Sequence, residues 1–425
     1  SFRALRESVT LRKLADSYKR LPRNIKVLAL GWLVWSPTQA MAGPYTQLYL
    51  SELGANPEKI SAVQSAHNVA NAIARLVGGY YADKQGRKKL IWQGTVLVAL
   101  TYVVMAAVAN WAVYAAAFIA NGFALYYQPA LESIQADSVS MLLRGRTYAL
   151  LNFLSGALTS VAPAAGAALV STFGLMDGVR IAFAASAITG FAIAAARYAW
   201  LEETLSEAGT KESIVRAYVE ALRETRREVK GILSVDLALN FTGGLTVLST
   251  YYTFYHLGLD AAYVGLLSAA GGLAGLAANI PAGYVVDKKG RGYALQLGLH
   301  LGTLSLLIFV LTPPRSSATL ALLLASSLVG SVGGPFYGLA YSALRADLVP
   351  ERSRGRVYAI LGLPPAAAWS IGALLGGWLY SAVGPRAPFA ASLALRVALT
   401  PLLLTVVRSL TRSVDSVVVA ANGAR

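Results

Sequence analysis

Three ionisable side chains within apolar stretches of this 425-residue chain could bind and release a proton. Glu132, Asp236 and His67 each have mostly uncharged neighbours in the sequence. A carboxylate or an imidazole in such surroundings changes its proton affinity when its access to water changes. We therefore predict a proton-binding role, first for Glu132 and second for Asp236. For His67, a neutral residue that only forms hydrogen bonds is the favoured alternative.

Each carboxylate also has a purely structural interpretation. Glu132 could form a static ion pair with Arg75, since charged groups inside a membrane commonly pair with one another. Asp236 could instead cap a helix or lie at the membrane surface. An ion pair that breaks when Glu132 is protonated would serve both purposes, because it would link proton binding to a change of conformation.

Uncharged polar and aromatic side chains follow the same stretches at helical spacing. Gln128, Glu132 and Gln135 are four and three residues apart, which places them on one face of a helix. We expect such faces to line a cavity for an organic substrate, where aromatic rings either stack on the substrate or pack against their neighbours. The candidate cavity residues are Trp32, Trp35, Gln39, Gln64, Asn68, Asn71, Arg75, Asn121, Gln128, Gln135, Asn240, Tyr251, Tyr337 and Tyr341.

The composition indicates a membrane protein. Hydrophobic residues make up 56% of the chain and charged residues only 14%, whereas soluble proteins carry about 25% charged residues. Spanning a bilayer takes roughly 20 apolar residues, and helices are expected because lipid offers the backbone no hydrogen bonds. We predict an all-α membrane protein with twelve transmembrane helices, near residues 25–51, 58–82, 89–109, 111–139, 147–173, 178–200, 231–257, 260–286, 292–312, 317–345, 356–382 and 387–408.

The distribution of the net charge of +16 predicts the topology. Most Lys and Arg residues fall on the N-terminal arm, the C-terminal tail and every second loop. The intervening loops hold only Lys59, Arg180, Arg315 and Arg386. This asymmetry follows the positive-inside rule and predicts a multi-pass protein of the cell membrane with both termini in the cytoplasm. We therefore expect the lipid bilayer, and no nucleic acid, as a partner.

Several other chemistries lack the residues that they need. The chain has no Cys and three His, so disulfides, thiolate metal sites and cysteine catalysis are excluded. No H-E-x-x-H motif, phosphate-binding loop or nucleophile–base constellation occurs in the sequence. We therefore predict that the protein is no enzyme and uses no metal or other cofactor.

A charged turn occurs twice, each time at the predicted cytoplasmic end of an apolar stretch. The skeleton G-x-x-x-D-K-x-G-R reads GYYADKQGR from Gly79 and GYVVDKKGR from Gly283. Asp137 and Asp347 begin a second repeated pattern, in which Arg-Gly-Arg follows the aspartate. Such parallel repeats occur in secondary transporters. The predicted organisation is an N-terminal arm (1–24), a six-helix bundle (25–200), a cytoplasmic linker helix (201–230), a pseudo-twofold-related six-helix bundle (231–408) and a cytoplasmic tail (409–425).

With these motifs the chain resembles the major facilitator superfamily of transporters over residues 25 to 408. The resemblance implies a central cavity lined by the first, fourth, seventh and tenth spans. It also implies that Asp83 contacts the eleventh span and Arg87 contacts Asp137, forming a latch that favours an outward-open state. The alternative is that these charges only fix the topology. The predicted latch residues are Gly79, Asp83, Gly86, Arg87, Asp137, Gly283, Asp287, Gly290, Arg291 and Asp347.

The residues LEETL at 201–205 resemble the drug:proton antiporter branch of this family. Phe118 stands where that branch has an arginine, and Ala162-Pro163-x-x-Gly166 retains only part of its fifth-span motif. The resemblance implies a monomeric secondary transporter that moves a small organic solute by alternating access, with proton-linked export. The alternatives are a proton-linked importer or a uniporter of a metabolite, and a transport-dead membrane receptor on the same fold.

Overall fold

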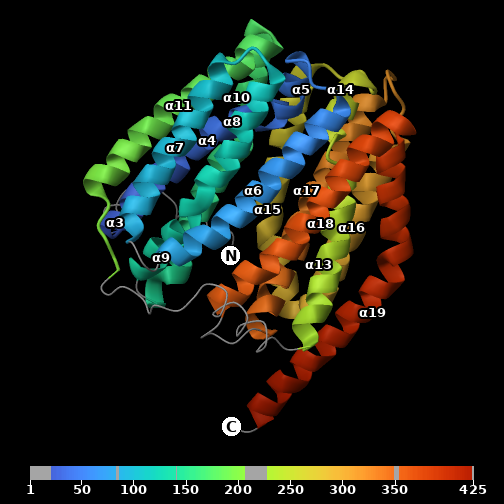
Figure 1. Cartoon of the computed structure of the whole chain (residues 1–425). Helices are drawn as coiled ribbons and strands as arrows, with labels where there is room; N and C mark the ends of the chain where they lie inside the picture. Colours follow the sequence, from blue (N-terminus) through green and yellow to red (C-terminus); the bar gives the residue numbers. More distant parts are fainter. Residues whose placement is uncertain (1–20, 83–85, 140, 206–226, 349–353, 424–425) are drawn as a thin grey trace, which may run out of the picture.

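The computed structural model describes residues 21–82, 86–139, 141–205, 227–348 and 354–423. Asp83, most of the predicted N-terminal arm and most of the predicted linker helix lie outside these residues, as does the side chain of Asp347. The described chain is helical almost throughout, and its helices form two bundles that lie side by side (Figure 1). This arrangement confirms the predicted all-α membrane protein with two related bundles.

The described residues of the N-terminal bundle form six spans, of which the first and fourth are broken. The first span consists of α3 (Arg23–Leu30), the π-helical turn η1 (Gly31–Trp35), α4 (Ser36–Ala42), the 3-10 turn η2 (Gly43–Tyr45) and α5 (Thr46–Glu52). The fourth consists of α8 (Trp111–Ala124), the 3-10 turn η3 (Leu125–Tyr127) and α9 (Gln128–Asp137). The continuous spans are α6 (Pro57–Ala82), α7 (Arg87–Ala107), α10 (Met141–Phe173) and α11 (Leu175–Trp200).

The C-terminal bundle repeats this order with one broken span. Its first span is divided into α13 (Arg227–Leu245) and α14 (Ser249–Tyr255). The spans that follow are α15 (Ala261–Lys289), α16 (Arg291–Leu311), α17 (Thr319–Leu348), α18 (Arg354–Ala382) and α19 (Ala387–Gly423). The helix α19 continues through most of the predicted tail, because no Pro or Gly interrupts residues 409–422.

Proline accompanies the breaks in the N-terminal bundle. Pro37, Pro44 and Pro129 lie in the first positions of α4, η2 and α9. Proline has no N–H to donate and its ring crowds the preceding turn, so a helix is easily interrupted or redirected there. In the C-terminal bundle the break follows Gly243 and Gly244, whose helix propensity is low. The broken spans are therefore among those that the family resemblance assigns to the cavity.

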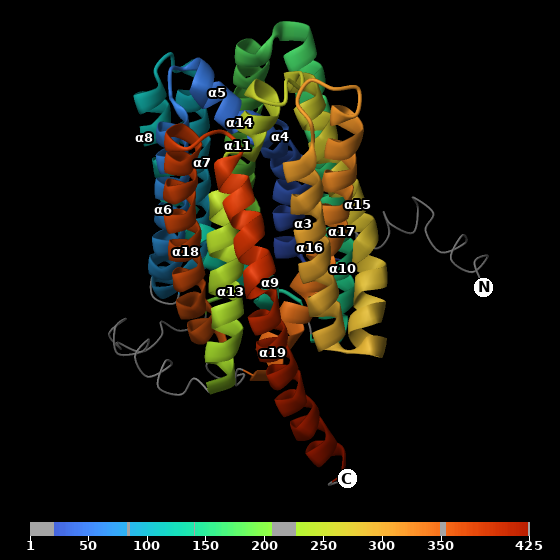
Figure 2. The same cartoon turned by 90° about the vertical axis from the view of Figure 1, so that its right-hand side faces the viewer.

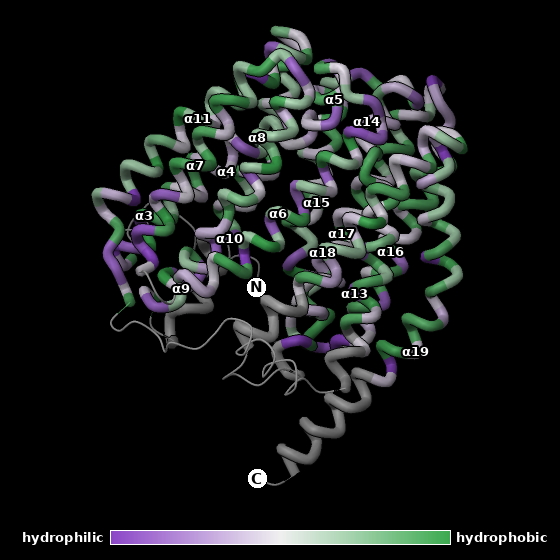
Figure 3. The backbone as a smooth tube through the Cα atoms, viewed as in Figure 1, coloured by the Kyte–Doolittle hydropathy of each residue, from purple (hydrophilic) through white to green (hydrophobic). Residues whose placement is uncertain are grey.

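The surface of the described helices suits a lipid environment. Seven of these helices are long and apolar enough to cross a membrane by length and composition. The first and fourth spans are not among them, because their breaks divide them into shorter helices. Large apolar side chains are widely exposed, among them Ile280 at 78% and Ile188 at 70%, and Figure 3 shows apolar residues along most of the helices. Contact with lipid tails accounts for apolar exposure on this scale.

The repeated glycine turn has the same geometry in both bundles. Gly86 precedes α7 with φ of 88°, and Gly290 precedes α16 with φ of 89°. A residue with a Cβ rarely adopts this left-handed region, whereas glycine enters it freely. Glycine at both positions therefore permits the same left-handed turn.

A second pair of contacts shows the same internal repeat. Gly94 of α7 packs against the ring of Tyr127, and a Cβ on this glycine would overlap that ring. Gly298 of α16 packs equally closely against Tyr337 of α17, where a Cβ would lie 2.6 Å from the backbone nitrogen. Each glycine lets two helices of one bundle approach closely. The two halves thus repeat a packing detail as well as a sequence motif.

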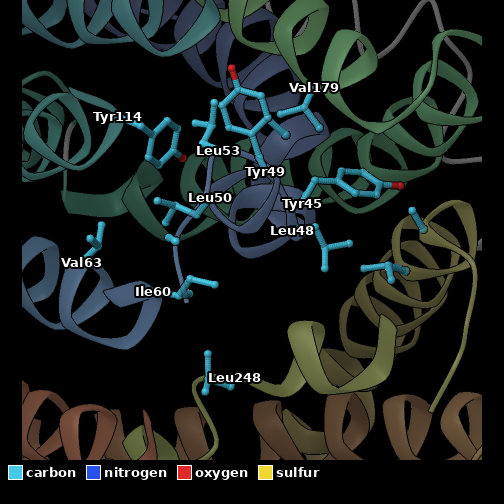
Figure 4. Close-up of a cluster of buried hydrophobic side chains, with 14 of the residues drawn as sticks. Tyr45, Leu48, Tyr49, Leu50, Leu53, Ile60, Val63, Tyr114, Val179 and Leu248 are labelled. Atoms are coloured by element: carbon cyan, nitrogen blue, oxygen red, sulfur yellow. The ribbon is translucent and has the colours of Figure 1, made fainter. Parts of the chain in front are cut away.

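The two bundles meet along α6 with α18 and along α10 with α15, and Figure 2 shows α6 beside α18. We call the end that carries α5 and α14 the outer end, following the predicted topology. There, the buried cluster in Figure 4 brings Leu48 of α5 together with Leu248, which precedes α14. Gln47 joins the same elements, since its Nε2 donates to the carbonyl of Val247 at 2.6 Å. The outer end is therefore closed by apolar packing and by hydrogen bonds between the bundles.

Single-cysteine labelling tests the predicted topology, and the absence of native Cys makes it specific. Asp177→Cys, at the outer end of α11, is expected to react with an impermeant maleimide added outside intact cells. Lys289→Cys, at the other end of α15, is expected to react only after the membrane is permeabilised. The charge asymmetry is the physical reason. Labelling of both positions from the same side would contradict the assignment.

Candidate functional site

A cavity of about 330 Å³ lies within the N-terminal bundle, among its first, fourth, fifth and sixth spans. The π-helical turn η1 and the helix α4 line one part of it, and η3 with α9 lines another. The break at η3 determines which face α9 turns inward. Most of the predicted polar face of the fourth span reaches this cavity. The predicted residues that line it are Trp32, Trp35, Gln39, Gln128, Glu132 and Gln135.

An ion pair lies on the α9 side of this cavity. Nη2 of Arg75 donates to Oε1 of Glu132 at 2.9 Å, and Nη1 of Arg75 donates to Oε1 of Gln128 at 2.6 Å. The side chains of Arg75 and Glu132 are 46% and 60% exposed. The pairing that sequence reasoning offered as the alternative for Glu132 is therefore present. A pair so exposed can open without leaving a buried, unpaired charge.

Arg197 is a cavity residue that the sequence analysis missed. It lies in α11 with only 2% of its surface exposed, and its Nη1 donates to Oγ1 of Thr95 at 2.6 Å. Its guanidinium carbon lies 5.7 Å from the ring centre of Trp35 and 5.6 Å from that of Tyr127. Aromatic faces stabilise a cation at such distances. The sequence holds one signal for this position. Arg197 follows Gly190 by seven residues, so the two residues lie on the same face of α11, which is the buried face.

Asn121 does not line the cavity, which corrects one prediction. It is buried and donates to Oγ1 of Thr101 in α7 at 2.8 Å. The 3-10 turn η3 separates Asn121 from Gln128. Because a 3-10 helix has about three residues per turn, the turn shifts the helical phase, and the predicted face does not continue across it.

The predicted polar face of the second span serves two different neighbours. Asn68 donates to the carbonyl of Ala366 at 3.0 Å and to Oγ of Ser370 at 3.1 Å, both in α18. His67 points to the fourth span, where it stacks on Phe118 with ring centres 4.0 Å apart. Its Nδ1 lies 2.7 Å from the carbonyl oxygen of Phe118. Asn68 thus joins the bundles, whereas His67 forms a hydrogen bond within its own bundle.

Gln64 and Asn71 lie on the same helix and are half-buried. Neither is among the residues that line the cavity described above. Oδ1 of Asn71 is buried without a hydrogen-bond partner among the described residues. Both therefore remain candidates on the basis of sequence alone.

Four predicted residues of the C-terminal bundle form one cluster of hydrogen bonds and ring contacts: Asp236, Asn240, Tyr337 and Tyr341. Oδ2 of Asp236 accepts from the hydroxyl of Tyr341 at 2.8 Å, and Oδ1 accepts from Nδ2 of Asn240 at 3.1 Å. Tyr337 stacks on Tyr341 with ring centres 5.5 Å apart. The guanidinium of Arg345 lies 5.3 Å from the centre of the Tyr341 ring. Asp236 therefore joins the seventh span to the tenth and is neither a helix cap nor a free surface group.

Tyr251 lies at the outer junction of the bundles, which corrects its prediction as a cavity residue. Its backbone N–H donates to Oε1 of Gln47 at 3.1 Å. Its ring packs against Tyr255 and Tyr380, with centres 4.5 Å and 5.6 Å away. The break after α13 starts a new helix before Tyr251, so the helical face that begins at Asp236 does not extend to it.

The first copy of the charged turn forms the expected ion pair between Arg87 and Asp137. Glu132 and Asp137 consequently serve different surfaces, as their spacing on the helix predicts. Nη1 of Arg87 also donates to Oγ1 of Thr204 at 3.0 Å. The segment after the sixth span therefore joins a polar cluster with the start of α7 and the end of α9.

Glu203 anchors this segment to the third span. Its Oε2 accepts from the backbone N–H of Lys88 at 2.9 Å, and its Oε1 accepts from the backbone N–H groups of Thr204 and Leu205, each at 3.0 Å. Partial burial by itself raises the pKa of Glu203. The backbone hydrogen bonds lower it by more than burial raises it, so the pKa lies below the usual value of a glutamate. The carboxylate thus satisfies N–H groups at the start of α7 that have no partner within the helix.

Close helix approach depends on Gly78 rather than on the motif residue Gly79. A Cβ on Gly78 would overlap the backbone of Tyr126 in the fourth span, whereas one on Gly79 would meet Pro129 at 3.9 Å, an ordinary contact. A Cβ on Gly283 would meet nothing within 4 Å. The close contact of α6 with the fourth span is therefore centred on Gly78, one residue before the motif glycine. In the second copy of the turn, Asp287 is exposed and follows Gly283 on α15.

Comparison with known proteins agrees with this geometry. The sequence matches the Major Facilitator Superfamily over residues 28–255 and 231–420. It is 25% identical to the uncharacterized MFS-type transporter YhjO of Bacillus subtilis (strain 168) over 403 residues, which cover 93% of this chain and 94% of the relative. The fold is similar to a peptide transporter POT in complex with alafosfalin, with TM-score 0.73, 16% identity and coverage of 92% and 95% of the two chains. It is also similar to the nucleoside transporter NupG, with TM-score 0.68, 13% identity and coverage of 90% and 98%.

Two helical bundles, one of which holds a polar cavity beside an ion pair, together with the family match define a membrane transporter rather than an enzyme. The chain belongs to the major facilitator superfamily. One of these structural neighbours is named a peptide transporter and the other a nucleoside transporter. The fold alone therefore leaves the substrate to be argued from the cavity.

Proposed function

We propose that the protein moves a small organic solute across the cell membrane by alternating access, with export linked to protons. The observation that carries the proposal is the Arg75–Glu132 pair at the cavity in the N-terminal bundle. Protonation of Glu132 removes the negative charge that attracts Arg75, so the ion pair becomes a weaker hydrogen bond to an uncharged acceptor. A proton that binds one conformation more tightly than another is linked to the equilibrium between them.

The surroundings of the pair favour an organic solute over an inorganic ion. Trp32 and Trp35 offer aromatic surface, and Gln39 and Gln135 offer both donors and acceptors on the cavity walls. Substrate pockets commonly combine such apolar walls with a few polar groups that fix orientation. A cavity of about 330 Å³ falls near the lower end of the range for small-molecule sites. We therefore expect a metabolite-sized or drug-sized solute.

Transport by purified protein tests the proposal. A thermal-shift screen of metabolites and drugs identifies ligands, because a ligand stabilises the state that it binds. Proteoliposomes then receive the radiolabelled ligand with and without a pH gradient. Gradient-driven accumulation that a protonophore collapses supports proton coupling, and its direction separates export from import. Exchange without accumulation would favour a uniporter. Binding without any transport would favour a receptor.

The latch gives a separate prediction. We expect Asp83→Asn to shift the protein towards inward-open states and to slow transport while leaving the fold intact. The substitution removes a charge-assisted contact that the family resemblance assigns to one conformation only, and such a contact is what shifts a population. Spin-label distances between residues near 82 in α6 and near 354 in α18 measure the shift. Asp287→Asn, in the second copy of the turn, is the matched comparison. An unchanged distance distribution in Asp83→Asn would reduce the motif to a marker of topology.

A further inference from the structure

A second cavity, of about 280 Å³, lies in the C-terminal bundle and contains the guanidinium of Arg396. Its walls come from α14, α16, α17 and α19 and from Thr246 at the break between α13 and α14. Every residue that lines it belongs to the C-terminal bundle, and the cavity at Glu132 is lined from the N-terminal bundle only. The two cavities are therefore different sites.

Arg396 is a charged group deep in a membrane span. It lies nine residues after the start of α19, which is about 13 Å along a helix at 1.5 Å per residue. The ion pairs between described residues do not include it. The cavity lining contains no Asp or Glu, and neither does that of a smaller cavity on the other side of Arg396, which is lined by His300, Thr303 and Thr400 among others. A charge at this depth is costly and usually has a functional partner.

The hydrogen bonds of the guanidinium leave its terminal groups available. Nε donates to Oγ1 of Thr242 at 3.2 Å. A guanidinium has five N–H donors, so the two terminal nitrogens hold the other four. A Cβ placed on Gly302 would lie 3.5 Å from Nη1, which locates this nitrogen beside the cavity wall formed by α16.

The remaining polar groups of the cavity are mostly acceptors. The hydroxyl of Ser305 donates to the carbonyl of Ser326 at 2.8 Å, and that of Ser326 donates to the carbonyl of Ser305 at 2.8 Å. The hydroxyl of Thr246 donates to the carbonyl of Gly243 at 2.8 Å. These hydroxyls have used their hydrogens and can only accept further bonds without rearranging. Apart from the hydroxyl of Ser249, the donors for an anion are therefore concentrated on Arg396.

The opposite end of the cavity is apolar. Phe309 and Phe389 line it with ring centres 5.1 Å apart. Phe389 precedes Arg396 by seven residues on α19, and Phe309 follows Gly302 by seven residues on α16. Two turns of helix, about 10 Å, thus separate the cationic end from the aromatic end on both walls.

We propose that this cavity binds a small carboxylate with an aromatic or aliphatic body, as a site separate from the one at Glu132. The carboxylate accepts two N–H bonds from Arg396, a pairing that the planar guanidinium favours. The apolar body lies against Phe309 and Phe389, where burial of its surface stabilises the complex. Bound in this way, the ligand neutralises the charge that the bundle holds between α16 and α19.

Binding of hydrocinnamate to the detergent-purified protein tests this site. We measure thermal midpoints and dissociation constants for hydrocinnamate, 3-phenylpropanol and inorganic phosphate at constant ionic strength. Hydrocinnamate is expected to raise the midpoint and to bind about tenfold more tightly than the alcohol, as expected for a charge-assisted hydrogen bond. Equal effects of the acid and the alcohol would show simple filling of an apolar cavity and would overturn the proposal. A response to phosphate alone would overturn the aromatic part of it.

Variants place the site and separate it from the transport cavity. Arg396→Gln is expected to weaken hydrocinnamate binding about tenfold or more, and Phe309→Ala to weaken the acid and the alcohol alike. Arg396→Lys keeps the charge and is expected to retain part of the binding if Arg396→Gln fails to fold. Arg180→Gln, at the outer edge of the other bundle, is the matched control and should bind as the wild type does.

Two further measurements separate alternative outcomes. Glu132→Gln is expected to retain hydrocinnamate binding, so a failure of the proposed transport mechanism leaves this inference standing. Loss of binding in Glu132→Gln but not in Arg396→Gln would instead assign the carboxylate to the cavity of the N-terminal bundle. Repeating the titration in nanodiscs of phosphatidylglycerol and of phosphatidylcholine reveals competition by anionic lipid. Complete suppression by phosphatidylglycerol alone would identify a lipid headgroup as the ligand and overturn the proposal.

Discussion

Glu132→Gln is expected to abolish accumulation driven by a pH gradient while leaving substrate exchange measurable. Glutamine has nearly the shape of the protonated carboxyl but cannot gain or lose a proton. Its amide oxygen can still accept a hydrogen bond from Arg75, which at present donates to Oε1 of Glu132 at 2.9 Å. The conformational equilibrium then no longer depends on protons, and the coupling, which is typically about 5–150-fold in affinity, disappears. Gradient-driven uptake and counterflow in the same proteoliposomes measure the two effects separately.

The chain offers a matched control for this substitution. Asp177 pairs with Arg180 at 3.4 Å at the outer end of α11, where its side chain is 68% exposed. Asp177→Asn removes a carboxylate from an arginine pair away from the cavity, and it should leave accumulation unchanged. Asp236→Asn is expected to have a smaller effect than Glu132→Gln, because Tyr341 and Asn240 hold Asp236 in a network between two helices of one bundle. Full accumulation in Glu132→Gln together with loss in Asp236→Asn would move the coupling role to the seventh span.

The fold could be predicted because its signals are long and repeated. Each apolar stretch extends over about 20 residues, and several of them end at a charged turn or a glycine. Gly86 and Gly290 are examples of such ends. Glycine enters the left-handed region freely, so a glycine at these positions predicts the turn. The ion pair of Arg87 with Asp137 was expected from the family resemblance that this motif helps to carry.

The candidate site was predicted less completely because helix breaks change which face points inward. Gln128, Glu132 and Gln135 follow η3 and share the cavity, whereas Asn121 precedes it and faces α7. A helical wheel assumes a constant 3.6 residues per turn and cannot place residues across a 3-10 turn. Tyr251 was misplaced for the same reason, because a break separates α13 from α14.

Buried cations were the other gap in the sequence analysis. Arg197 lies within one turn of the end of α11, and at that position the positive-inside rule assigns an arginine to the cytoplasmic surface. Only the structure shows it between Trp35 and Tyr127. Arg396 was visible as a charge in the middle of the last span, but its cavity is formed by helices that are far apart in the sequence. Neither environment follows from local periodicity.

Gly265→Leu is expected to prevent closure of the outer end and thereby to stop transport. Gly265 of α15 faces the N-terminal bundle, where a Cβ would lie 2.5 Å from the carbonyl oxygen of Pro163 and 3.1 Å from Cβ of Ala167, and would overlap the hydroxyl of Tyr45. These neighbours all belong to the opposite bundle. The added side chain therefore strains the junction without disturbing the packing inside either bundle, so each bundle should still fold.

The size of the effect follows from the cost of overpacking. Forcing additional methylene groups into a packed contact costs about 1–3 kcal/mol or more, and each 1.4 kcal/mol changes an equilibrium tenfold. We expect the outer-closed population to fall by about tenfold or more.

Cysteines at Glu52 and Tyr255, whose side chains now form a hydrogen bond of 3.1 Å, report closure through a bifunctional maleimide. Cross-linking should be efficient in the otherwise wild-type protein and weak in Gly265→Leu. Gly334→Leu is the control, because a Cβ there meets nothing within 4 Å. Equal cross-linking in all three proteins would show that the outer junction can accommodate a leucine, and alternating access would then not depend on the close approach of α10 and α15.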